Sequence, residues 1–519
     1  MAKICLCLTG KTLARNLEMI DRYRAYIDLA ELRVDCLSDD EHDSVRRFPA
    51  LAGLPVILTV RRKNDGGHSK YGESSRIVIL SKALAFAHPD SRHNFAYVDL
   101  EEDLDVPSLE EVARAFGTRI IRSFHNFEGT PSNLSARIKS LYHVGDEIAK
   151  ISLMPKSLDD VRTLFEISKE LRDKEKILIA MGDLGQCTRI LAEKLGSYLT
   201  YTCAKYESEM QSAAPGQIDP VELCDLFHFR EINDKTTVYG ISGYPLRSTG
   251  SPLFYNNIFN KEKMNNVYVR FPSAKIESFL QFADTISLAG ASITVPHKEA
   301  VLKYLSEISD EVKSVGACNT IVRTERGWAG YNTDTSGFQG SLLNLINSSA
   351  EKTSVPKRLF LKIFPRNNNL KGKRCTVIGA GGASRAVCAV LSRLQGKALI
   401  LNRDIVRAKE LAALYKFEYG PLDEESAKRM KKFRDIIIQT TSVGMEPNID
   451  KDPVPSYEFD GSEIVIDIIY KPAQTKFLQR AIRAGCKAIN GEDMLYRQGL
   501  DQYACFFGTE YPVDSDKRR

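Results

Sequence analysis

The chain has 519 residues, more than one hydrophobic core usually supports, which predicts roughly two to four domains. Its hydrophobic content of 43% and charged content of 27% are those of an ordinary globular chain. The net charge is +5, and 72 basic residues are scattered among 67 acidic ones, so the sequence does not indicate a surface for nucleic acid or for an anionic membrane.

The cysteines and the N-terminus suggest a cellular setting. The 11 cysteines are spread along the chain without a C-x-x-C motif or a Cys/His cluster, so we expect reduced, buried thiols and no metal site. No stretch approaches the roughly 18 consecutive apolar residues of a membrane span. The chain runs directly into a strand-like segment at residues 3–8 without a signal or transit pattern. We therefore expect a cytoplasmic protein whose mature chain begins near Met1.

The first part of the chain alternates short apolar runs with amphipathic segments, which is typical of parallel strands crossed over by helices. Eight such repeats predict a closed (β/α)8 barrel, or TIM barrel, whose chemistry lies at the carboxyl ends of the strands. The predicted strands are Ile4–Leu8, Leu29–Val34, Val56–Val60, Phe95–Leu100, Arg119–Phe124, Ala149–Met154, Lys176–Met181 and Tyr198–Ala204.

Lys150 is the most informative position in this barrel, because it lies in an apolar run that spans residues 147–155. A buried ammonium without a partner tends to lose its proton, and a neutral amine can attack a carbonyl carbon to form an imine. His125, at the end of the preceding run, is a candidate base. The alternative is a lysine whose stem crosses the strand end while its ammonium reaches water. The first interpretation predicts a Schiff-base enzyme.

Further polar residues lie at or just after the ends of other predicted strands. Glu31 and Arg33 are two residues apart on the second strand and therefore point to the same side. Three arginines, an imidazole and an amine at one opening would suit a hydroxylated carboxylate that carries a ketone. The candidate residues at this mouth are Glu31, Arg33, Arg61, His125, Lys150, Arg189 and Gln217.

In chain order these residues resemble the type I 3-dehydroquinate dehydratases, over about residues 1–230. The matching motifs are Glu31-Leu32-Arg33-Val34-Asp35, Thr59-Val60-Arg61, Ser123-Phe124-His125-Asn126-Phe127, the Lys150 strand and Ala214-Pro215-Gly216-Gln217-Ile218. The resemblance implies that Lys150 forms an imine with the substrate ketone and that His125 removes the adjacent proton and helps to expel water. It also implies that Arg189 binds the substrate carboxylate. The implied hydroxyl contacts are Glu31, Arg33, Arg61 and Gln217.

The chain departs from the usual pattern of that family at three positions. Asp65 stands where a glutamate is usual and is one methylene shorter. Asn126 stands where an aspartate usually follows the histidine, and Ala213 stands where a serine or threonine is usual. Ser212, one residue before Ala213, carries a hydroxyl. The shorter side chain of Asp65 bears on how His125 is supported, and Ala213 removes a hydroxyl from the predicted site.

A short polar stretch at residues 230–235 precedes a second unit, which begins with a strand at 237–241. The stretch is too short for a freely reorienting tether. Further along, a glycine-rich turn lies between a strand-like run ending at Ile378 and an apolar helix pattern beginning at Ala386. Backbone amides at such a turn can approach a pyrophosphate at the helix N-terminus, so the turn predicts a Rossmann-like dinucleotide-binding domain.

The strand after this turn bears on the choice of cofactor. It ends in Asn402 and Arg403, where a NAD-preferring site would place an acidic residue for the ribose hydroxyls. Arg403 and Arg407 can pair with a 2′-phosphate, so we expect a preference for NADP. The alternative is two exposed arginines at a helix start.

Ahead of the nucleotide domain, Lys298, Asn319 and Asp334 lie near the ends of short apolar runs. Together they could grip vicinal hydroxyls and pass a proton, whereas singly they would be turn and cap residues. With other motifs they resemble the shikimate dehydrogenases over about residues 236–508. The motifs are Ser248-Thr249-Gly250-Ser251-Pro252, Gly290-Ala291-Ser292-Ile293-Thr294-Val295-Pro296-His297-Lys298, Gly316-Ala317-Cys318-Asn319-Thr320, Tyr331-Asn332-Thr333-Asp334, Asn402-Arg403, Asp467-Ile468-Ile469-Tyr470 and Met494-Leu495-Tyr496-Arg497-Gln498-Gly499.

This second resemblance implies a catalytic pair. Lys298 would supply a proton when NADPH delivers hydride to the 3-ketone, and Asp334 would position the hydroxyl and tune the lysine. The implied substrate contacts are Thr249, Ser251, Thr294, Asn319, Tyr470, Gln498 and Gln502. The implied cofactor contacts are Gly379, Ala380, Gly381, Gly382, Ala383, Asn402, Arg403, Arg407, Thr441 and Gly491.

The second half also departs from its family's pattern. The usual Ser-x-Ser clamp begins with Thr249, which keeps a hydroxyl, and Thr335 replaces a glycine. Asp404 replaces a threonine and adds a negative charge near the proposed 2′-phosphate. Residues 348–371 form a long basic insertion to which no motif assigns a role.

The whole sequence predicts an α/β chain of three domains. They are a barrel at 1–230, a shikimate-binding domain at 236–345 completed by C-terminal helices at 492–519, and an NADP-binding Rossmann-like domain at 370–491. The product of the first reaction, 3-dehydroshikimate, is the substrate of the second, so the fusion would catalyse consecutive steps of the shikimate pathway. The expected partners are 3-dehydroquinate, 3-dehydroshikimate and shikimate, with no nucleic acid or membrane.

Three alternatives remain open. The barrel lysine would also suit a class I aldolase or transaldolase, although an obvious glycine-rich phosphate loop is lacking after the last two predicted strands. The folds could serve a metabolite-sensing regulator, against which the retention of His125, Lys150, Lys298 and Asp334 argues. The second half could also oxidise quinate, with Thr249 and Thr335 at the positions where that choice could be made.

Overall fold

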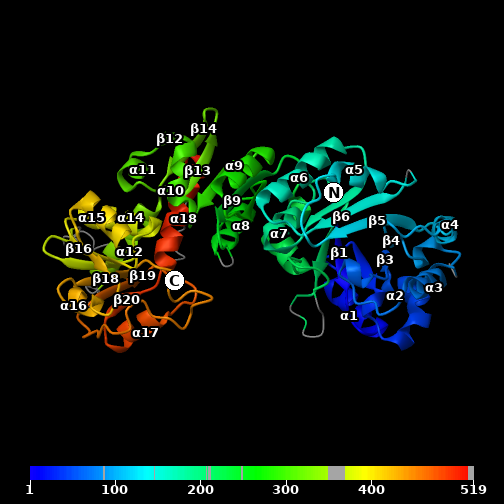
Figure 1. Cartoon of the computed structure of the whole chain (residues 1–519), viewed down its shortest axis with the longest axis horizontal. Helices are drawn as coiled ribbons and strands as arrows, with labels where there is room; N and C mark the ends of the chain where they lie inside the picture. The colour runs from blue at the N-terminus through cyan, green and yellow to red at the C-terminus, as the bar shows by residue number, and fades with distance from the viewer. Residues whose placement is uncertain are drawn as a thin grey trace. The chain divides into compact units, whose positions relative to one another are not determined.

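The computed structural model describes residues 1–85, 88–144, 146–205, 207, 212–246, 249–348 and 369–511. The chain forms two compact units, Met1–Leu288 and Ala289–Arg519. Figure 1 shows the helices and strands of both units.

Eight parallel strands form the sheet of the first unit, in the order β7-β6-β5-β4-β3-β2-β1-β8. A hydrogen bond of 2.7 Å from Tyr198 N to Lys176 O joins the starts of β7 and β8, so the barrel is nearly closed. The predicted barrel is therefore confirmed, and each predicted strand lies within about two residues of an observed one. The strands are β1 (Lys3–Leu8), β2 (Leu29–Arg33), β3 (Val56–Thr59), β4 (Tyr97–Glu101), β5 (Arg119–Asn126), β6 (Ile148–Leu153), β7 (Lys176–Ala180) and β8 (Leu199–Cys203).

Helices connect the barrel strands, because parallel neighbours cannot be joined by a tight turn. They are α1 (Leu13–Tyr23), α2 (Phe48–Ala52), α3 (Glu73–Leu84), α4 (Pro107–Ala115), α5 (Leu134–Ser140), α6 (Leu158–Glu170) and α7 (Gly182–Ile190). The short helices of this unit are η1 (Val34–Cys36), η2 (Asp39–Arg47), η3 (Lys63–Asp65), η4 (Ser91–His93), η5 (Glu222–Leu226) and η6 (Phe229–Glu231). Apolar side chains such as Leu29, Ile57, Ile148 and Ile177 fill the barrel interior.

The segment that follows the barrel packs against it within the same compact unit. Helix α9 lies on α6, where the rings of Phe165 and Phe282 are 5.4 Å apart and Ser278 Oγ donates to Asp159 Oδ2 at 2.7 Å. The compact unit ends at Leu288, although the sequence places residues 236–288 in the second domain. The predicted domain boundaries stay predictions. The segment consists of β9 (Thr237–Gly243), α8 (Ser251–Lys261), β10 (Asn266–Pro272) and α9 (Ile276–Thr285).

The second unit begins with four strands and ends with a helix that returns to them. Strand β13 is antiparallel to both β11 and β14, β12 is parallel to β14, and the last helix, α18, packs on α12. Of the predicted C-terminal helices, α18 is described, and residues 512–519 lie outside the described residues. The elements are β11 (Gly290–Ile293), α10 (His297–Ala300), η7 (Val301–Tyr304), β12 (Leu305–Ile308), α11 (Asp310–Val315), β13 (Thr320–Thr324), β14 (Gly327–Tyr331), α12 (Asp334–Asn347) and α18 (Glu492–Phe507).

A parallel six-stranded sheet in the order β17-β16-β15-β18-β19-β20 completes the second unit and confirms the predicted Rossmann-like fold. One face packs against α12, α14 and α15, and the other against α16 and α17. Most of the unassigned insertion, residues 349–368, lies outside the described residues. The elements are β15 (Arg374–Ile378), α14 (Gly382–Arg393), β16 (Lys397–Asn402), α15 (Ile405–Tyr415), β17 (Glu418–Pro421), α16 (Ser426–Met430), β18 (Ile436–Gln439), β19 (Ile464–Asp467), α17 (Lys476–Arg483) and β20 (Lys487–Ile489).

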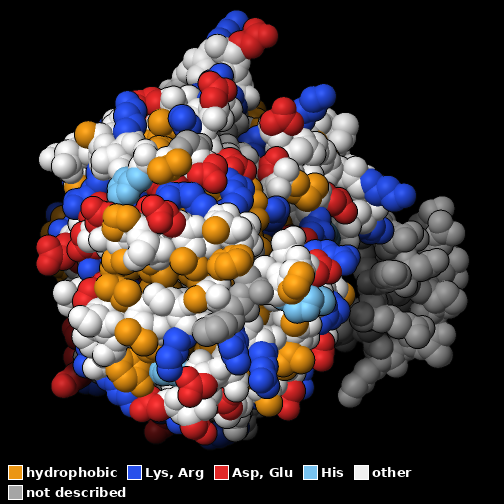
Figure 2. All heavy atoms as spheres, turned by 90° about the vertical axis from the view of Figure 1, so that its right-hand side faces the viewer, with side chains coloured by type: hydrophobic (Ala, Val, Ile, Leu, Met, Phe, Trp, Pro, Cys, Tyr) orange, Lys and Arg blue, Asp and Glu red, His pale blue; other side chains and the backbone are white. Residues whose placement is uncertain are grey.

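The surface charge, the cysteines and the helices can each be compared with what the sequence predicts. On the face shown in Figure 2, acidic and basic side chains are intermingled, so neither sign of charge dominates that face. All 11 cysteines are free thiols. Within the described ranges, none of the helices combines the length and the apolar character needed to cross a membrane.

Candidate active sites

The carboxyl ends of the barrel strands enclose a cavity of about 110 Å³, called here the barrel pocket. Every residue that the sequence predicts for this mouth lines it, although these residues are far apart in the chain. The predicted lining residues are Glu31, Arg33, Arg61, His125, Lys150, Arg189 and Gln217. The side chains that sequence reasoning missed include Cys7, Ser152, Ile179, Met181 and Tyr201.

The amine of Lys150 is buried and has a carboxylate partner. Its Nζ lies 2.7 Å from Asp99 Oδ2, 3.8 Å from Glu31 Oε1 and 4.3 Å from the centre of the Tyr201 ring. The expectation of a buried amine without a partner is therefore wrong. A counter-ion holds Lys150 inside the barrel, and the lysine does not reach out to solvent as the alternative interpretation required.

Barrel geometry explains why Lys150 meets Asp99. Side chains in one layer of such a barrel come from alternate strands, and β2, β4, β6 and β8 here supply Glu31, Asp99, Lys150 and Tyr201. The sequence argument considered strand ends, whereas Asp99 lies in the middle of β4. The signal that could have identified it is a carboxylate flanked by apolar residues inside a predicted strand.

A chain of buried ion pairs runs from Asp99 outward to helix α3. Asp99 Oδ2 is 2.7 Å from Arg61 Nη2, Arg61 Nη1 is 3.2 Å from Glu101 Oε1, and Glu101 Oε2 is 2.7 Å from Arg76 Nη2. Burial alone would raise the pKa of Asp99, but the charges of Arg61 and Lys150 outweigh it and lower that pKa far below its usual value. Asp99 is therefore an ionised counter-ion at neutral pH.

His125 lies near the end of β5, lines the same pocket and has 9% of its side chain exposed. Burial, and after it the positive charges of Arg61 and Lys150, lower the pKa of His125 well below 6.5, so its ring is neutral near pH 7. Its Nδ1 lies 3.7 Å from Asp65 Oδ1 and has no hydrogen-bond partner among the residues that the structure describes. A neutral imidazole can accept a proton, so His125 can act as a base.

Arg189 differs from the other two arginines of the pocket. Arg33 and Arg61 each have a carboxylate oxygen 2.7 Å away, whereas Arg189 donates to the carbonyls of Tyr201 and Pro215 at 3.3 and 3.2 Å. Its Nε has no hydrogen-bond partner in the described part of the chain. Burial lowers the pKa of Arg189 to about 10, so the guanidinium remains charged at neutral pH. A buried cation that faces no carboxylate is suited to bind an anion.

The side-chain amide of Gln217 is held at both ends. Its Oε1 accepts hydrogen bonds from Ala213 N at 2.9 Å, Ala214 N at 3.2 Å and Ser212 Oγ at 3.1 Å. Its Nε2 donates to Cys7 Sγ at 3.1 Å. The hydroxyl of Ser212 thus supports Gln217, and alanine leaves position 213 without a hydroxyl in the pocket.

In the second unit the structure brings four predicted residues together, from α10, the start of β13, α12 and α18. Lys298 Nζ donates to Asp334 Oδ2, and Asn319 Nδ2 donates to Asp334 Oδ1 at 2.9 Å and to Gln498 Oε1 at 3.4 Å. A Cβ atom at Gly382 would lie 3.0 Å from Lys298 Cδ, so the lysine stem rests against the first residue of α14. The Lys298–Asp334 pair therefore lies beside the glycine-rich turn.

Two further side chains brace this cluster. Gln502 is buried, donates to Thr320 Oγ1 at 2.6 Å and accepts a hydrogen bond from Ser292 Oγ at 2.5 Å. Thr333, which sequence reasoning missed, accepts a hydrogen bond from Asn319 Nδ2 at 3.0 Å. These bonds join α18 to β11 and β13, and the predicted role of Gln502 as a substrate contact stays a prediction.

The remaining predicted substrate residues lie in three places. Thr294 follows β11 and Tyr470 follows β19 in the second unit. Thr249 and Ser251 lie at the start of α8 in the first unit, where Thr249 Oγ1 donates to Ser251 Oγ at 3.2 Å. The hydroxyl of Thr335 is buried and donates to Asn332 O at 3.2 Å. Their roles stay predictions.

A larger cavity of about 1180 Å³, called here the Rossmann cavity, opens beside the glycine-rich turn. Gly379 has a φ of 116°, and a Cβ there would lie 2.6 Å from Thr440 Oγ1, so only glycine fits this turn. Gly382 and Ala383 begin α14 and Gly491 precedes α18, and these three predicted cofactor residues are not among the residues that line the cavity. The predicted cofactor residues that line the cavity are Gly379, Ala380, Gly381, Asn402, Arg403, Arg407 and Thr441.

The carboxylate of Asp404 caps a helix and lies near Arg407. It accepts a hydrogen bond from Val406 N at 3.0 Å, as an N-cap of α15, and lies 3.7 Å from Arg407 Nε. Among the described residues, Arg403 has no ion-pair partner. The negative charge of Asp404 therefore acts mainly on Arg407.

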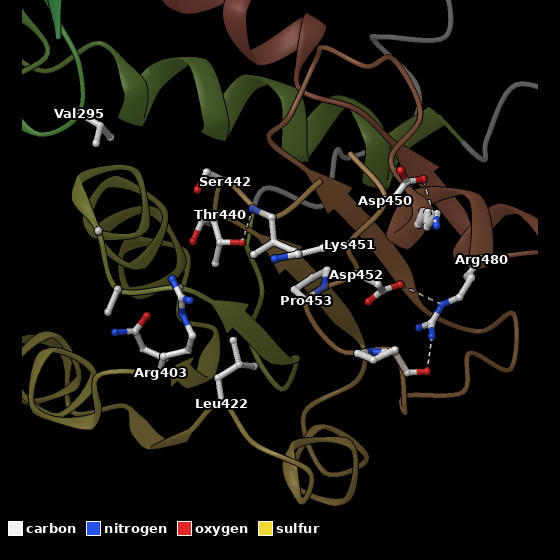
Figure 3. Close-up of a pocket in the computed structure, with 18 of the residues that line it drawn as sticks. Val295, Arg403, Leu422, Thr440, Ser442, Asp450, Lys451, Asp452, Pro453 and Arg480 are labelled. Atoms are coloured by element: carbon white, nitrogen blue, oxygen red, sulfur yellow. Dashed lines mark hydrogen bonds and ion pairs between the residues drawn. The ribbon is translucent and has the colours of Figure 1, made fainter. Parts of the chain in front are cut away.

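The opposite wall of the Rossmann cavity was not predicted from the sequence. Asp450 pairs with Lys476 and Asp452 pairs with Arg480, each at 3.2 Å. In Figure 3, Arg403 lies on one side of the cavity and Asp452 with Arg480 on the other. These residues follow β18 or lie on α17, where no motif marks them.

The residues present fit a phosphorylated dinucleotide, because a helix N-terminus and exposed arginines meet in one large cavity. In the described ranges, His, Cys, Asp and Glu side chains form no group of three or more that could hold a metal ion. The two sites together define a class: a two-centre enzyme that joins a lysine-based lyase barrel to an oxidoreductase.

Comparison with known proteins identifies the family within this class. Three family models match: type I 3-dehydroquinase over residues 4–234, the shikimate dehydrogenase substrate-binding domain over 241–321, and shikimate/quinate 5-dehydrogenase over 359–470. The bifunctional 3-dehydroquinate dehydratase/shikimate dehydrogenase of Arabidopsis thaliana is 31% identical, covering 94% of this chain and 79% of the relative. The chain belongs to this bifunctional family.

Two more relatives resemble the second half. The NADP(+) shikimate dehydrogenase of Caldanaerobacter subterraneus is 35% identical over 292 residues, which cover 55% of this chain and 96% of the relative. A crystal structure of shikimate dehydrogenase from Aquifex aeolicus is 31% identical, covers 54% of this chain and 96% of that one, and has a TM-score of 0.45.

Proposed function

We propose that the barrel dehydrates 3-dehydroquinate through an imine at Lys150 and that the second unit reduces the resulting 3-dehydroshikimate to shikimate with NADPH. The observation that carries this proposal is the buried contact of Lys150 with Asp99, at 2.7 Å, in a pocket that also contains His125. A lysine and a neutral base that line one small cavity, with a buried counter-ion against the lysine, are the groups that imine chemistry needs.

In the barrel, Lys150 attacks the ketone carbon and water leaves as the imine forms. The ammonium of Lys150 gives up a proton before the attack, and that proton ends in the water that leaves. Asp99 stays ionised, and its negative charge stabilises the cationic iminium. The iminium withdraws electrons from the neighbouring carbon, so His125 can remove a proton there and return it to the departing hydroxyl. Hydrolysis of the iminium releases the product and restores the lysine.

Arg189 would bind the substrate carboxylate, because its guanidinium is the one in the barrel pocket that faces no carboxylate among the described residues. Glu31 would accept hydrogen bonds from the ring hydroxyls of the substrate, and Gln217 would donate to them. Arg33 and Arg61 already have carboxylate partners 2.7 Å away, so their main effect would be on the charge and shape of the pocket.

In the second unit, Lys298 would donate a proton to the ketone oxygen, and Asp334 would hold the lysine in place for that transfer. When bound, the nicotinamide cofactor supplies the hydride. Asn319 Nδ2 lies 2.9 Å from Asp334 Oδ1 and 3.4 Å from Gln498 Oε1. The amides of Asn319 and Gln498 would therefore position the substrate hydroxyls. Thr249, Ser251, Thr294, Tyr470 and Gln502 complete the proposed substrate set.

The residues proposed to hold the cofactor are Gly379, Ala380, Gly381, Gly382, Ala383, Asn402, Arg403, Arg407, Thr441 and Gly491. Arg403 and Arg407 line the Rossmann cavity and would pair with the 2′-phosphate, which favours NADP over NAD. A cytoplasmic location and the absence of nucleic-acid or membrane partners complete the proposal.

The coupled reaction tests this proposal. NADPH loss would be followed after adding dehydroquinate to the wild type, to Lys150→Ala and to Lys298→Ala. Each variant should lose the coupled signal, by roughly 10⁴-fold or more for a residue that bonds to the substrate. Lys150→Ala should still oxidise NADPH when dehydroshikimate is supplied. If borohydride leaves Lys150 unlabelled while dehydration continues, the imine proposal is wrong.

A further inference from the structure

The thiol of Cys7 lies inside the barrel pocket, at the carboxyl end of β1. Cys7 is 2% exposed and lines the cavity. Its Sγ donates to Glu31 Oε2 at 3.2 Å and accepts a hydrogen bond from Gln217 Nε2 at 3.1 Å. One sulfur atom therefore links two side chains that would hold the substrate hydroxyls.

The orientation of the Gln217 amide depends on this sulfur. Three donors, two of them backbone N–H groups, converge on Gln217 Oε1 at 2.9 to 3.2 Å, so Nε2 has to point the other way, toward Cys7. Burial, and after it the charge of Glu31, raise the pKa of the Cys7 thiol well above its usual value. The S–H is therefore present as the donor that Glu31 requires.

A second observation shows that this part of the pocket is built to receive an anion. Arg189 is 2% exposed, lines the same cavity and has an Nε atom without a hydrogen-bond partner among the described residues.

We propose that Cys7 is a positioning residue of the dehydratase pocket, which sets the spacing and orientation of Glu31 and Gln217 beside Arg189. The proposal rests on the proposed function of the barrel. Because the described hydrogen bonds of Cys7 go to groups that would orient the substrate, and not to Lys150 or His125, Cys7 should affect substrate binding more than imine chemistry.

Three substitutions separate hydrogen bonding from packing. Cys7→Ser keeps a donor and an acceptor, Cys7→Val fills the space of the sulfur with a slightly larger apolar group, and Cys7→Ala removes both the hydrogen bonds and the volume. Cys5→Ala, two residues earlier on β1, is the matched control, because Cys5 is a buried thiol that does not line the pocket. KM and kcat for dehydroquinate would be measured together with borohydride capture at saturating substrate.

The expected result is a rise in KM of about 10-fold in Cys7→Ala and Cys7→Val, because both variants lose the hydrogen bonds of the sulfur. In both variants kcat and borohydride capture should change by less than about threefold. Cys7→Ser should restore KM to within about threefold of the wild type, and Cys5→Ala should leave it unchanged. NADPH oxidation with added dehydroshikimate should be the same in all variants.

Wild-type KM in both Cys7→Ala and Cys7→Val would overturn the inference. Equal losses in Cys7→Ser and Cys7→Val, or a matching loss in Cys5→Ala, would show that sulfur volume or general packing matters and would overturn it as well. If the wild type itself fails to turn over dehydroquinate, the proposed function is what fails.

Discussion

The barrel pocket and the Rossmann cavity handle charge in opposite ways. In the barrel pocket, about 110 Å³ in volume, buried cations and carboxylates face each other at 2.7 to 3.8 Å. In the Rossmann cavity, about 1180 Å³, Arg403 and Arg407 are exposed and Asp404 reaches only one of them, at 3.7 Å. The first site is prearranged before a substrate enters, and the second leaves positive charge for the ligand to neutralise.

This contrast follows from the chemistry proposed for each site. An iminium is a charge that forms during the reaction, so a buried, fixed carboxylate such as Asp99 stabilises it without solvent having to reorganise. A dinucleotide already carries its charge and has to bind and leave in every cycle. Exposed arginines suit this because water weakens each ion pair and so permits release. Substitutions should therefore have large effects in the barrel and small ones in the Rossmann domain.

The largest effect is expected at His125. His125→Ala should lower dehydratase kcat by about 10³-fold, since it removes the proposed base. The imidazole acts when it is neutral, and its pKa lies well below 6.5, so activity should persist as pH falls and be lost only below pH 6.5. The measurement is kcat/KM for dehydroquinate against pH. An acid limb at or above pH 6.5 would contradict the effect of burial on His125.

Asp99→Asn should have the next largest effect, because it leaves Arg61 and Lys150 without the carboxylate that they share at 2.7 Å. We expect dehydratase kcat to fall about 100-fold and barrel stability to fall by about 3 kcal/mol. Hydrogen exchange of β4 and β6 would measure the stability, with NADPH oxidation on added dehydroshikimate as the control.

The pH dependence of that stability has a defined sign. The fold lowers the pKa of Asp99, so its ion pairs stabilise the barrel fully above the unfolded value of about 3.9 and lose this effect as pH falls through the folded value. Asp99→Asn should therefore differ from the wild type at pH 7 and converge with it in strong acid. A constant difference across that range would argue against an ionised Asp99.

Arg403→Gln tests the Rossmann cavity. It should raise KM for NADPH about 10-fold and leave KM for NADH unchanged, because only NADPH carries the 2′-phosphate. Arg434→Gln is the matched control: Arg434 is another exposed arginine of this domain, paired with Asp460, and it does not line the cavity. An equal rise for both cofactors would place the phosphate elsewhere.

The smallest effect is expected at Asp404. Asp404→Ser keeps an N-cap for α15 and removes the carboxylate that lies 3.7 Å from Arg407. The ratio of kcat/KM for NADPH to that for NADH should rise about threefold, because an exposed ion pair such as that of Asp404 with Arg407 has a small energy. A ratio that falls, or stays the same, would mean that Asp404 does not weaken the discrimination between the two cofactors.

By itself the sequence determined the fold class and many of the residues that gather at the two candidate sites. Eight apolar runs in strand–helix alternation predicted the barrel, and the residues at the run ends proved to line one pocket because parallel strands present their carboxyl ends together. The glycine-rich turn predicted the Rossmann cavity because its conformation depends on local sequence. Position 379 has a positive φ, which favours glycine, so the single residue Gly379 indicates the turn.

Only the tertiary structure decided which of these side chains meet. Asp99 pairs with Lys150 across the intervening strand β5, because the stagger of a barrel places alternate strands in one layer. Cys7 and Gln217 are separated by almost the whole barrel sequence and meet at 3.1 Å because β1 pairs with β8, and Ile218, next to Gln217, pairs with Thr202 of β8. The packing of α9 on α6 depends on the shapes of two helix surfaces. Periodicity fixes which face of an element is buried, but the partner on that face depends on three-dimensional closure.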